Sequence, residues 1–254
     1  MATTTHVPPG TNSSDGTTAV AVVTGASRGL GLALTRELSK RGWTIVVDAR
    51  DADALSAAVA GVPGVHAVPG DVTDDRHRRQ LVSTAERLGC GRIDLLVNNA
   101  SQLGPSPQPL LDDYPTDELG RVFEVNVLAP LALIRYSLPW LISARGVVVD
   151  VSSDAAVQPY AGWGGYGASK AALDHASAVL AVEHPDLRVY AFDPGDMRTQ
   201  MHQDAFPGED ISDRPEPGSV VPALLRLLAE QPPSGRVRAL DLAETEPASS
   251  EATS

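Results

Sequence analysis

A tyrosine and a lysine stand four residues apart, at Tyr166 and Lys170, where the sequence predicts a helix over residues 166–183. Side chains at this spacing share one helix face. A free phenol has a pKa of about 10 and is a poor acid or base near neutral pH, but a neighbouring ammonium group lowers that pKa. The pair therefore suits proton transfer to or from an alcohol or carbonyl oxygen. Taken alone, a Tyr/Lys pair at this spacing occurs often by chance, and an ordinary helix face without catalytic function is the more common interpretation.

Polar or turn-forming residues follow three apolar segments that we interpret as buried strands. These residues are Asn98-Asn99-Ala100 after residues 93–97, Ser152-Ser153 after residues 147–151, and Asp193-Pro194-Gly195 after residues 187–192. In a parallel sheet, ligands bind at the carboxyl ends of the strands. We therefore expect these residues to meet at one edge of the sheet.

The first apolar segment, residues 19–24, runs into a turn that contains Gly25, Gly29 and Gly31 and leads directly into a helical pattern over residues 31–41. Glycines at such a turn let a diphosphate approach the backbone and let the helix pack close to the sheet. The N-terminus of the helix offers unpaired N–H groups to phosphates. The first two glycines are one residue further apart than in the usual dinucleotide fingerprint, and a glycine turn that binds nothing is the alternative.

Short apolar segments alternate with helical patterns along the whole chain. Strands are predicted over residues 19–24, 44–48, 65–68, 93–97, 147–151, 187–192 and 236–242, and helices over residues 31–41, 51–60, 74–89, 117–143, 166–183 and 219–230. We expect Asp74 to cap the third helix, and Pro130 and Pro139 to disturb the long fourth one. The alternation predicts an α/β fold: a doubly wound (Rossmann) parallel sheet of seven strands with helices on both faces.

One domain is expected over residues 18–243, because no shift of composition divides this range. Residues 1–17 read as a disordered leader without the apolar run of a signal peptide, and residues 244–254 as a disordered acidic tail. The segment 127–142 is interpreted as a buried or interface helix, too short and too polar to span a bilayer.

Together these residues resemble the single-domain short-chain dehydrogenase/reductase family over about residues 18–243. The shared motifs stand in the family's order and spacing: Thr24-Gly25-x-x-x-Gly29-x-Gly31, Asp71-Val72, Asn98-Asn99-Ala100, Asn126, Ser153, Tyr166-x-x-x-Lys170, and Pro194-Gly195 followed by Thr199. One position departs from the family, because Ser101 follows Ala100 where a glycine is usual. We expect a somewhat different loop path there.

The resemblance implies a set of catalytic residues. Ser153, thirteen residues before Tyr166, would hydrogen-bond the substrate carbonyl oxygen, and Tyr166 would transfer the proton. Lys170 would hold the nicotinamide ribose and tune Tyr166, and Asn126 would support a water chain that reaches Lys170. For Asn126 the alternative is an amide that only bonds to backbone.

The same resemblance implies the cofactor-binding residues. They are Gly25, Ser27, Arg28, Gly29, Leu30, Gly31, Arg50, Asp71, Val72, Asn98, Ala100, Tyr166, Lys170, Pro194, Gly195 and Thr199. Among them Asp71 and Val72 would contact the adenine, Asn98 would brace the sheet edge near the ribose, and Thr199 would contact the carboxamide. No metal is expected.

The residues after the second predicted strand bear on the choice between NAD and NADP. An acid about 20 residues after the glycine turn favours NAD, and Asp48 is a candidate. The family's spacing from Gly25 places the deciding position at Ala49 instead, which has no carboxylate to repel a phosphate. Arg50 and Arg28 could clamp a 2′-phosphate. We expect NADP(H), with NAD(H) possible; the alternative is that both arginines are solvated.

The leading hypothesis is an NADP(H)-dependent oxidoreductase that interconverts a carbonyl and a secondary alcohol. A catalytically silent dinucleotide sensor or scaffold on the same fold is the second hypothesis. It has no need for Asn126, Ser153, Tyr166 and Lys170 together. A dehydratase or epimerase is a third, and such enzymes usually have longer chains.

The composition of the chain indicates which classes of binding partner are expected. The formal net charge is -12, so nothing electrostatic favours nucleic acid or an anionic membrane. The one cysteine, Cys90, fits a reducing, cytoplasmic compartment. We expect a small-molecule carbonyl or alcohol substrate, a mobile lid over residues 197–217, and a homodimer or homotetramer. The substrate is expected to be apolar and to contain a ring, as Trp163, Tyr160 and Leu103 suggest. A polar group on this substrate is suggested by Asp154 and His202.

Overall fold

Seven parallel strands form one sheet in the order β3-β2-β1-β4-β5-β6-β7, in a computed structural model that describes residues 18–243. The strands are β1 Val20–Val23, β2 Thr44–Val47, β3 Val65–Ala67, β4 Leu95–Asn98, β5 Val147–Val151, β6 Arg188–Asp193 and β7 Gly235–Arg238. The predicted doubly wound sheet is thereby confirmed. The segments 1–17 and 244–254, predicted to be disordered, lie outside the described residues. Strand order reverses between β1 and β4, and at such a switch point a crevice opens beyond the strand ends.

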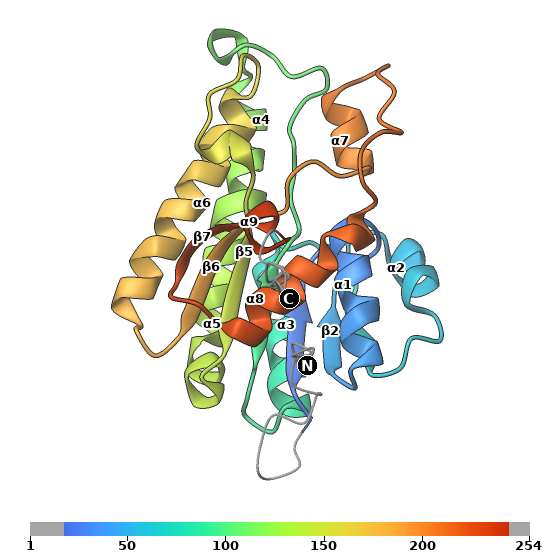
Figure 1. Cartoon of the computed structure of the whole chain (residues 1–254), viewed down its shortest axis with the longest axis vertical. Coiled ribbons are helices and arrows are strands. Elements are labelled where there is room, and N and C mark those ends of the chain that lie inside the picture. The colour runs from blue at the N-terminus through green and yellow to red at the C-terminus, as the bar shows by residue number, and fades with distance from the viewer. Residues whose placement is uncertain (1–17, 244–254) are drawn as a thin grey trace, which may run out of the picture.

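Helices cover both faces of the sheet (Figure 1). They are α1 Gly29–Lys40, α2 Ala52–Val59, α3 Asp75–Leu88, α4 Thr116–Phe123, α5 Ala129–Ala144, α6 Gly164–Glu183, α7 Gln200–Ala205, α8 Val221–Glu230 and α9 Ala239–Ala243. Short 3-10 turns occupy Leu111–Asp113, Asp154–Ala156 and Pro217–Ser219, and a π turn occupies Glu124–Leu128.

The two faces of the sheet bury separate cores. Along β1, Ala21 and Val23 belong to a core that includes Leu34 of α1 and Leu224 of α8. Their neighbours Val20 and Val22 belong to a second core that includes Leu81 of α3 and Leu133 of α5. Alternate side chains of a strand point to opposite faces, so a strand between two helical layers must be apolar at every position. This explains the uninterrupted apolar runs in the sequence.

Two predicted elements differ from the structure. The predicted last strand, 236–242, ends at Arg238, because the apolar residues beyond it form α9, whose Ala239 is buried in the core beside α8. The predicted helix 117–143 is interrupted at the π turn Glu124–Leu128 rather than at its prolines. Pro130 lies in the first turn of α5, where a helix tolerates proline, and Pro139 lies inside α5 without ending it.

The predicted cap of α3 is present. The carboxylate of Asp74 accepts a hydrogen bond of 2.8 Å from the backbone N–H of Arg76. An acidic cap stabilises the positive end of the helix dipole.

The run from α4 through α5, Thr116–Ala144, is long and apolar enough to cross a membrane by length and composition alone, which differs from the sequence prediction for residues 127–142. Its Leu133, Ile134 and Leu141 are nevertheless buried in the core shared with α3. Core helices of folded domains pass the same test, and we assign this run to the core.

Candidate active site

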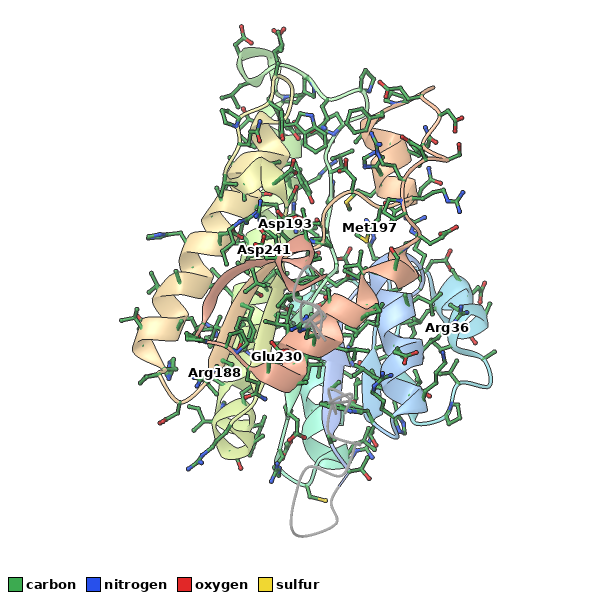
Figure 2. The ribbon with its side chains drawn as sticks, viewed as in Figure 1. Arg36, Arg188, Asp193, Met197, Glu230 and Asp241 are labelled. Atoms are coloured by element: carbon green, nitrogen blue, oxygen red, sulfur yellow. The ribbon has the colours of Figure 1, made fainter. Side chains whose placement is uncertain are left out.

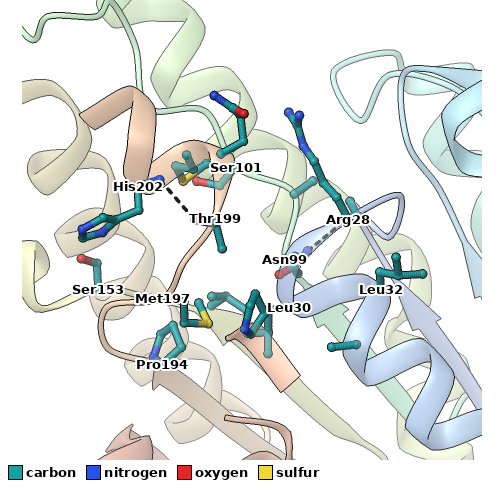
Figure 3. Close-up of a pocket in the computed structure, with 18 of the residues that line it drawn as sticks. Arg28, Leu30, Leu32, Asn99, Ser101, Ser153, Pro194, Met197, Thr199 and His202 are labelled. Atoms are coloured by element: carbon teal, nitrogen blue, oxygen red, sulfur yellow. Dashed lines mark hydrogen bonds between the residues drawn. The ribbon is translucent and has the colours of Figure 1, made fainter. Parts of the chain in front are cut away.

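The carboxyl ends of the strands meet a cavity of about 1570 Å³ (Figure 3). In Figure 2, Arg188 and Asp193 mark the two ends of β6, and Asp193 lies at the end nearer α7, close to Met197. Most of the predicted site residues line this cavity: Gly25, Ser27, Arg28, Gly29, Leu30, Arg50, Ala100, Ser153, Tyr166, Lys170, Pro194, Gly195 and Thr199. The others, Gly31, Asp71, Val72, Asn98 and Asn126, do not.

The glycine turn between β1 and α1 is shaped for close backbone approach. Gly25 and Gly29 have φ values of 68° and 60°, a conformation that favours glycine. A Cβ at Gly31 would lie 2.6 Å from both the Gly25 carbonyl oxygen and Asn99 Nδ2. Gly31 therefore acts by letting α1 pack against the turn, and not as part of the cavity wall.

The N-terminus of α1 opens from this turn. Its N-cap, Arg28, makes no side-chain capping bond, so the N–H groups of the first turn remain available to an anion. Together the helix end without a side-chain cap, the glycines with positive φ and the size of the cavity fit a dinucleotide whose diphosphate lies over the turn.

The next strand end, after β4, is tied to the glycine turn by hydrogen bonds. Thr24 Oγ1 accepts from the backbone N–H groups of Asn99 and Ala100, each at 2.9 Å, and Asn99 Nδ2 donates to the carbonyl oxygen of Thr24 at 2.8 Å. Asn98 points elsewhere, because its Nδ2 donates to the buried carboxylate of Asp150 at 2.7 Å. Asn98 thus braces β4 against β5 inside the sheet.

The acid at the end of β2 is turned away from the cavity. Asp48 is 1% exposed; its Oδ1 accepts from the Gly25 N–H at 2.8 Å and its Oδ2 lies 3.0 Å from His77 Nε2. Ala49 and Arg50 line the cavity instead. Asp48 therefore holds the glycine turn and is not placed to bind a ribose hydroxyl.

The residues predicted to contact adenine serve a local turn in this structure. Asp71 Oδ1 accepts from the backbone N–H and the hydroxyl of Thr73, both at 2.9 Å, and Val72 is buried. Neither side chain lines the cavity.

Tyr166 and Lys170 face the cavity from the first turns of α6, as predicted, and both are almost fully buried. Lys170 Nζ donates to the carbonyl oxygen of Val151 at 2.7 Å and lies 5.5 Å from the centre of the Tyr166 ring. Burial lowers the pKa of Lys170 to about 8, because it penalises the charged ammonium.

The expected lowering of the Tyr166 pKa by Lys170 is wrong for this structure. Burial raises the pKa of Tyr166 to about 12, since a phenolate loses its hydration there. Hydrogen bonds from the hydroxyls of Ser101 and Ser153 act in the opposite direction, and the carboxylates of Asp193 and Asp154 add to the increase. The phenol is therefore held in its protonated form at neutral pH.

Ser153 follows β5 and begins a 3-10 turn. Its Oγ donates to Asp154 Oδ1 at 2.9 Å and accepts from the Ala155 N–H at 3.2 Å. The other oxygen of Asp154 accepts from the Tyr160 hydroxyl at 2.8 Å. The carboxylate orients the Ser153 hydroxyl beside Tyr166.

Asn126 is fully buried in the π turn between α4 and α5. Its Oδ1 accepts from the Gln102 N–H at 2.8 Å and from Ser101 Oγ at 3.1 Å. Its Nδ2 donates to the Gln102 carbonyl at 2.9 Å and to Ser169 Oγ at 2.9 Å. Every hydrogen-bonding position of the amide is used, and Asn126 joins the loop after β4 to α6. A π turn often marks a functional position in a helix.

Beside Tyr166, the cavity is lined by the rings of Trp163 and His202, and Phe206 packs behind them. Trp163 lies with its ring centre 5.8 Å from those of Tyr166 and Phe206, and His202 lies 4.9 Å from Phe206. Thr199 caps α7 by accepting from the His202 N–H at 3.1 Å, which Figure 3 marks. The segment predicted as a lid therefore contains a capped helix that faces the catalytic end.

Arg236 in β7 does not line the cavity, but it holds residues that do, and it was not identified from the sequence. Its guanidinium donates to Ser152 Oγ at 2.8 Å, to the Ser153 carbonyl at 2.9 Å and to Asp193 Oδ2 at 2.8 Å, and it also pairs with Asp174. It thus ties together the ends of β5 and β6 and helix α6. The available signal was weak, because β7 reads Gly-Arg-Val-Arg and carries a second arginine, Arg238.

Within residues 18–243, no cluster of three or more His, Cys, Asp or Glu side chains is arranged to hold a metal ion. The chemistry available from the described side chains is hydrogen bonding and proton transfer by Tyr166, Ser153 and Lys170.

Comparisons with known proteins agree with this geometry. A family model described as short chain dehydrogenase matches residues 19–210. Sepiapterin reductase of Xenopus laevis is 34% identical over 221 residues, which cover 79% of this chain and 84% of that protein. Serine 3-dehydrogenase of Agrobacterium fabrum is 35% identical over 187 residues, which cover 71% and 72%.

Among solved structures, a short chain dehydrogenase from Escherichia coli CFT073 complexed with NADPH superposes with a TM-score of 0.81 at 28% identity, covering 88% of this chain and 97% of that one. The order of the strands, the residues at their ends and these likenesses lead to one assignment. The chain belongs to the short-chain dehydrogenase family and is an NAD(P)-dependent oxidoreductase that acts on CH–OH groups.

Proposed function

We propose that the protein interconverts a carbonyl and a secondary alcohol with NADP(H), and that Tyr166 is the general acid and base. The observation that carries the proposal is the grouping of Tyr166, Ser153 and Lys170 at one end of a cavity whose other end is the glycine turn. When bound, the reduced dinucleotide supplies the hydride. The roles of the chain's own residues follow from their contacts.

In the direction of reduction, Tyr166 gives its proton to the oxygen of the substrate as that oxygen gains negative charge. The raised pKa, about 12, keeps this proton in place until an alkoxide, a stronger base, forms next to it. The phenolate left behind is stabilised by hydroxyl donors and by the ammonium group of Lys170. In the direction of oxidation the same phenolate removes the proton of the alcohol.

Ser153 binds the substrate oxygen. Its hydroxyl now donates to Asp154 and can rotate toward a carbonyl oxygen beside Tyr166, where it would stabilise developing charge. Lys170 would hold the ribose of the dinucleotide through its ammonium group, and its bond to the Val151 carbonyl fixes the direction of the side chain.

The preference for NADP(H) rests on the residues at the other end of the cavity. Arg28 and Arg50 are exposed in the cavity wall, and Ala49 between the strand and Arg50 carries no carboxylate. Asp48, the acid that would favour NAD, is buried against Gly25 and His77. The similar structure from Escherichia coli contains NADPH, which supports the same choice.

The proposal is tested by the loss of NADPH absorbance, and separately of NADH absorbance, with a panel of ketones, aldehydes and diketones. We expect turnover with NADPH and a lower kcat/KM with NADH. In Arg50→Ala the kcat/KM with NADPH should fall about 10-fold or more, since a charge-assisted bond is lost, while that with NADH should change little. Faster turnover with NADH than with NADPH would refute the proposed role of Arg28 and Arg50 in binding the 2′-phosphate. Tight NADPH binding without turnover of any substrate would favour a dinucleotide sensor.

We also propose that copies of the chain associate through α5 and α6. Exposed apolar side chains gather on these helices: Leu128 just before α5, Leu131 and Ile142 on α5, and Val179 and Val182 on α6. Light scattering after size-exclusion chromatography measures the mass directly. A monomeric mass at micromolar concentration would refute the association.

A further inference from the structure

Ser101 occupies the position after Asn99 and Ala100, at the exit of β4, where the resemblance predicts glycine. Its side chain lies in the cavity wall between the glycine turn and the catalytic end (Figure 3). Ser101 Oγ lies 3.1 Å from Asn126 Oδ1, and its hydroxyl is also within hydrogen-bonding reach of the Tyr166 phenol oxygen. The added hydroxyl therefore bridges two residues of the catalytic end.

A serine hydroxyl has one proton to donate, and Ser101 has two acceptors for it. While Tyr166 is protonated, the phenol can donate to Ser101 Oγ and the Ser101 proton can go to Asn126 Oδ1. When Tyr166 becomes a phenolate, the Ser101 proton can rotate toward the phenolate oxygen. Asn126 Oδ1 then still accepts from the Gln102 N–H at 2.8 Å, so no buried acceptor is left without a partner.

Asn126 does not need Ser101 to hold its position, because its amide has other hydrogen-bond partners. Without Ser101, Asn126 keeps its bonds to both backbone atoms of Gln102 and to Ser169. What only Ser101 adds is a second hydroxyl beside Tyr166, in addition to that of Ser153, whose single proton is directed to Asp154 in this structure.

We propose that Ser101 is a positioning residue that acts through Tyr166: its hydroxyl switches from Asn126 to the phenolate and stabilises the deprotonated tyrosine. This inference rests on the proposed role of Tyr166 as general acid and base. The charged groups that face Tyr166 are Lys170 on its own helix, Asp154 on the 3-10 turn and Asp193 at the end of β6. The two carboxylates disfavour the phenolate, which makes a second hydroxyl donor useful.

The test compares Ser101→Ala and Ser101→Gly with Ser101→Thr, which keeps a hydroxyl. The first measurement is the pH profile of kcat for alcohol oxidation with NADP⁺, which rises with the fraction of phenolate. Loss of the donor should move the rising limb about one pH unit or more to higher pH, because a hydrogen bond to a charged group is removed. Threonine should restore the wild-type limb. Ser83→Ala, on the exposed face of α3, is the matched control and should leave the profile unchanged.

A second readout does not depend on turnover. Tyrosine labelled with ¹³C at Cζ reports tyrosinate directly by NMR, and Tyr166→Phe identifies the signal of Tyr166. With NADP⁺ bound, the wild type should show more Tyr166 tyrosinate than Ser101→Ala at the same pH. The proposal would be overturned if the wild type and Ser101→Ala had the same fraction of Tyr166 tyrosinate at every pH, including the case in which neither shows any. It would also be overturned if Ser101→Ala raised only KM and left the rising limb of the kcat profile at the same pH. If the fractions differ but no substrate turns over, the proposed function fails and the role of Ser101 stands.

Discussion

The two ends of the cavity are built by different means. At the cofactor end, shape comes from the backbone: glycines with positive φ at Gly25 and Gly29, a contact at Gly31 that excludes any side chain, and a helix end without a side-chain cap. At the catalytic end, shape comes from polar side chains that bridge distant segments, above all the buried Asn126 and the partly buried Arg236. Changes at the first end should act through steric fit, and changes at the second through charge and proton position.

The strongest expected effect on the cofactor end comes from Gly31→Val. A Cβ there already meets two atoms at 2.6 Å, one of them backbone, so α1 must move away from the turn. We expect a loss of about 2–3 kcal/mol in the free energy of unfolding and at least a 10-fold weaker binding of NADPH. Urea denaturation and titration of NADPH fluorescence measure the two effects.

Gly120→Ala in α4 is the matched control, because nothing lies within 4 Å of a Cβ there. It should stabilise the protein by about 0.5–1 kcal/mol, since alanine is the better helix former. Equal destabilisation by the two substitutions would show that steric fit at Gly31 does not shape the cofactor end.

At the catalytic end, Arg236→Ala should have the next largest effect. It leaves Asp193, which is 6% exposed, and Asp174, which is 14% exposed, without their cation. We expect a loss on the order of 3 kcal/mol in the free energy of unfolding, and a lower kcat because the ends of β5 and β6 lose their common anchor.

The control is Arg121→Ala, which removes the exposed ion pair between Arg121 and Glu118. It should lower the free energy of unfolding by less than about 1 kcal/mol. A stability loss of the same small size for Arg236→Ala would mean that the network at the catalytic end contributes little.

A smaller effect is expected at Asp150, which is buried behind the catalytic end. Burial raises the pKa of Asp150 above its ordinary value, although hydrogen bonds from Ser177 and Asn98 act to lower it. A group with a raised pKa in the folded state stabilises the fold below its unfolded pKa, and this contribution is lost as the pH rises through the folded pKa.

Asp150→Asn removes the buried charge and can keep both hydrogen-bond partners. It should therefore raise Tm by about 2–4 °C at pH 8, and the gain should vanish near pH 4 or below. Thermal unfolding followed by circular dichroism at the two pH values provides the measurement. A lower Tm at pH 8 would show that the ionised carboxylate stabilises this end of the sheet.

The difference between the two ends also explains what could be predicted from the sequence. The strands, the glycine turn and the position of Tyr166 and Lys170 at the start of α6 depend on residues that are close in the chain, and their patterns are local. The catalytic end depends on pairs such as Asn98 with Asp150, 52 residues apart, and Arg236 with Ser152, 84 residues apart. No local pattern encodes such pairs.

Two interpretations failed for the same physical reason. Lys170 was expected to lower the pKa of Tyr166, but burial, which the spacing of two residues does not reveal, dominates and raises it. The apolar segment after Arg238 was read as strand, but its burial against α8 is a tertiary contact and makes it helix α9.

The most direct test of the central claim is single-turnover reduction of a ketone substrate by Tyr166→Phe at saturating NADPH, with the Kd for NADPH measured in parallel. The phenylalanine keeps the ring contact with Trp163 and removes only the hydroxyl. We predict a rate lower by about 10²–10⁴-fold with an NADPH affinity within about twofold of the wild type. A Tyr166→Phe enzyme that reduces the ketone at the wild-type rate would contradict the assignment of Tyr166 as the proton donor.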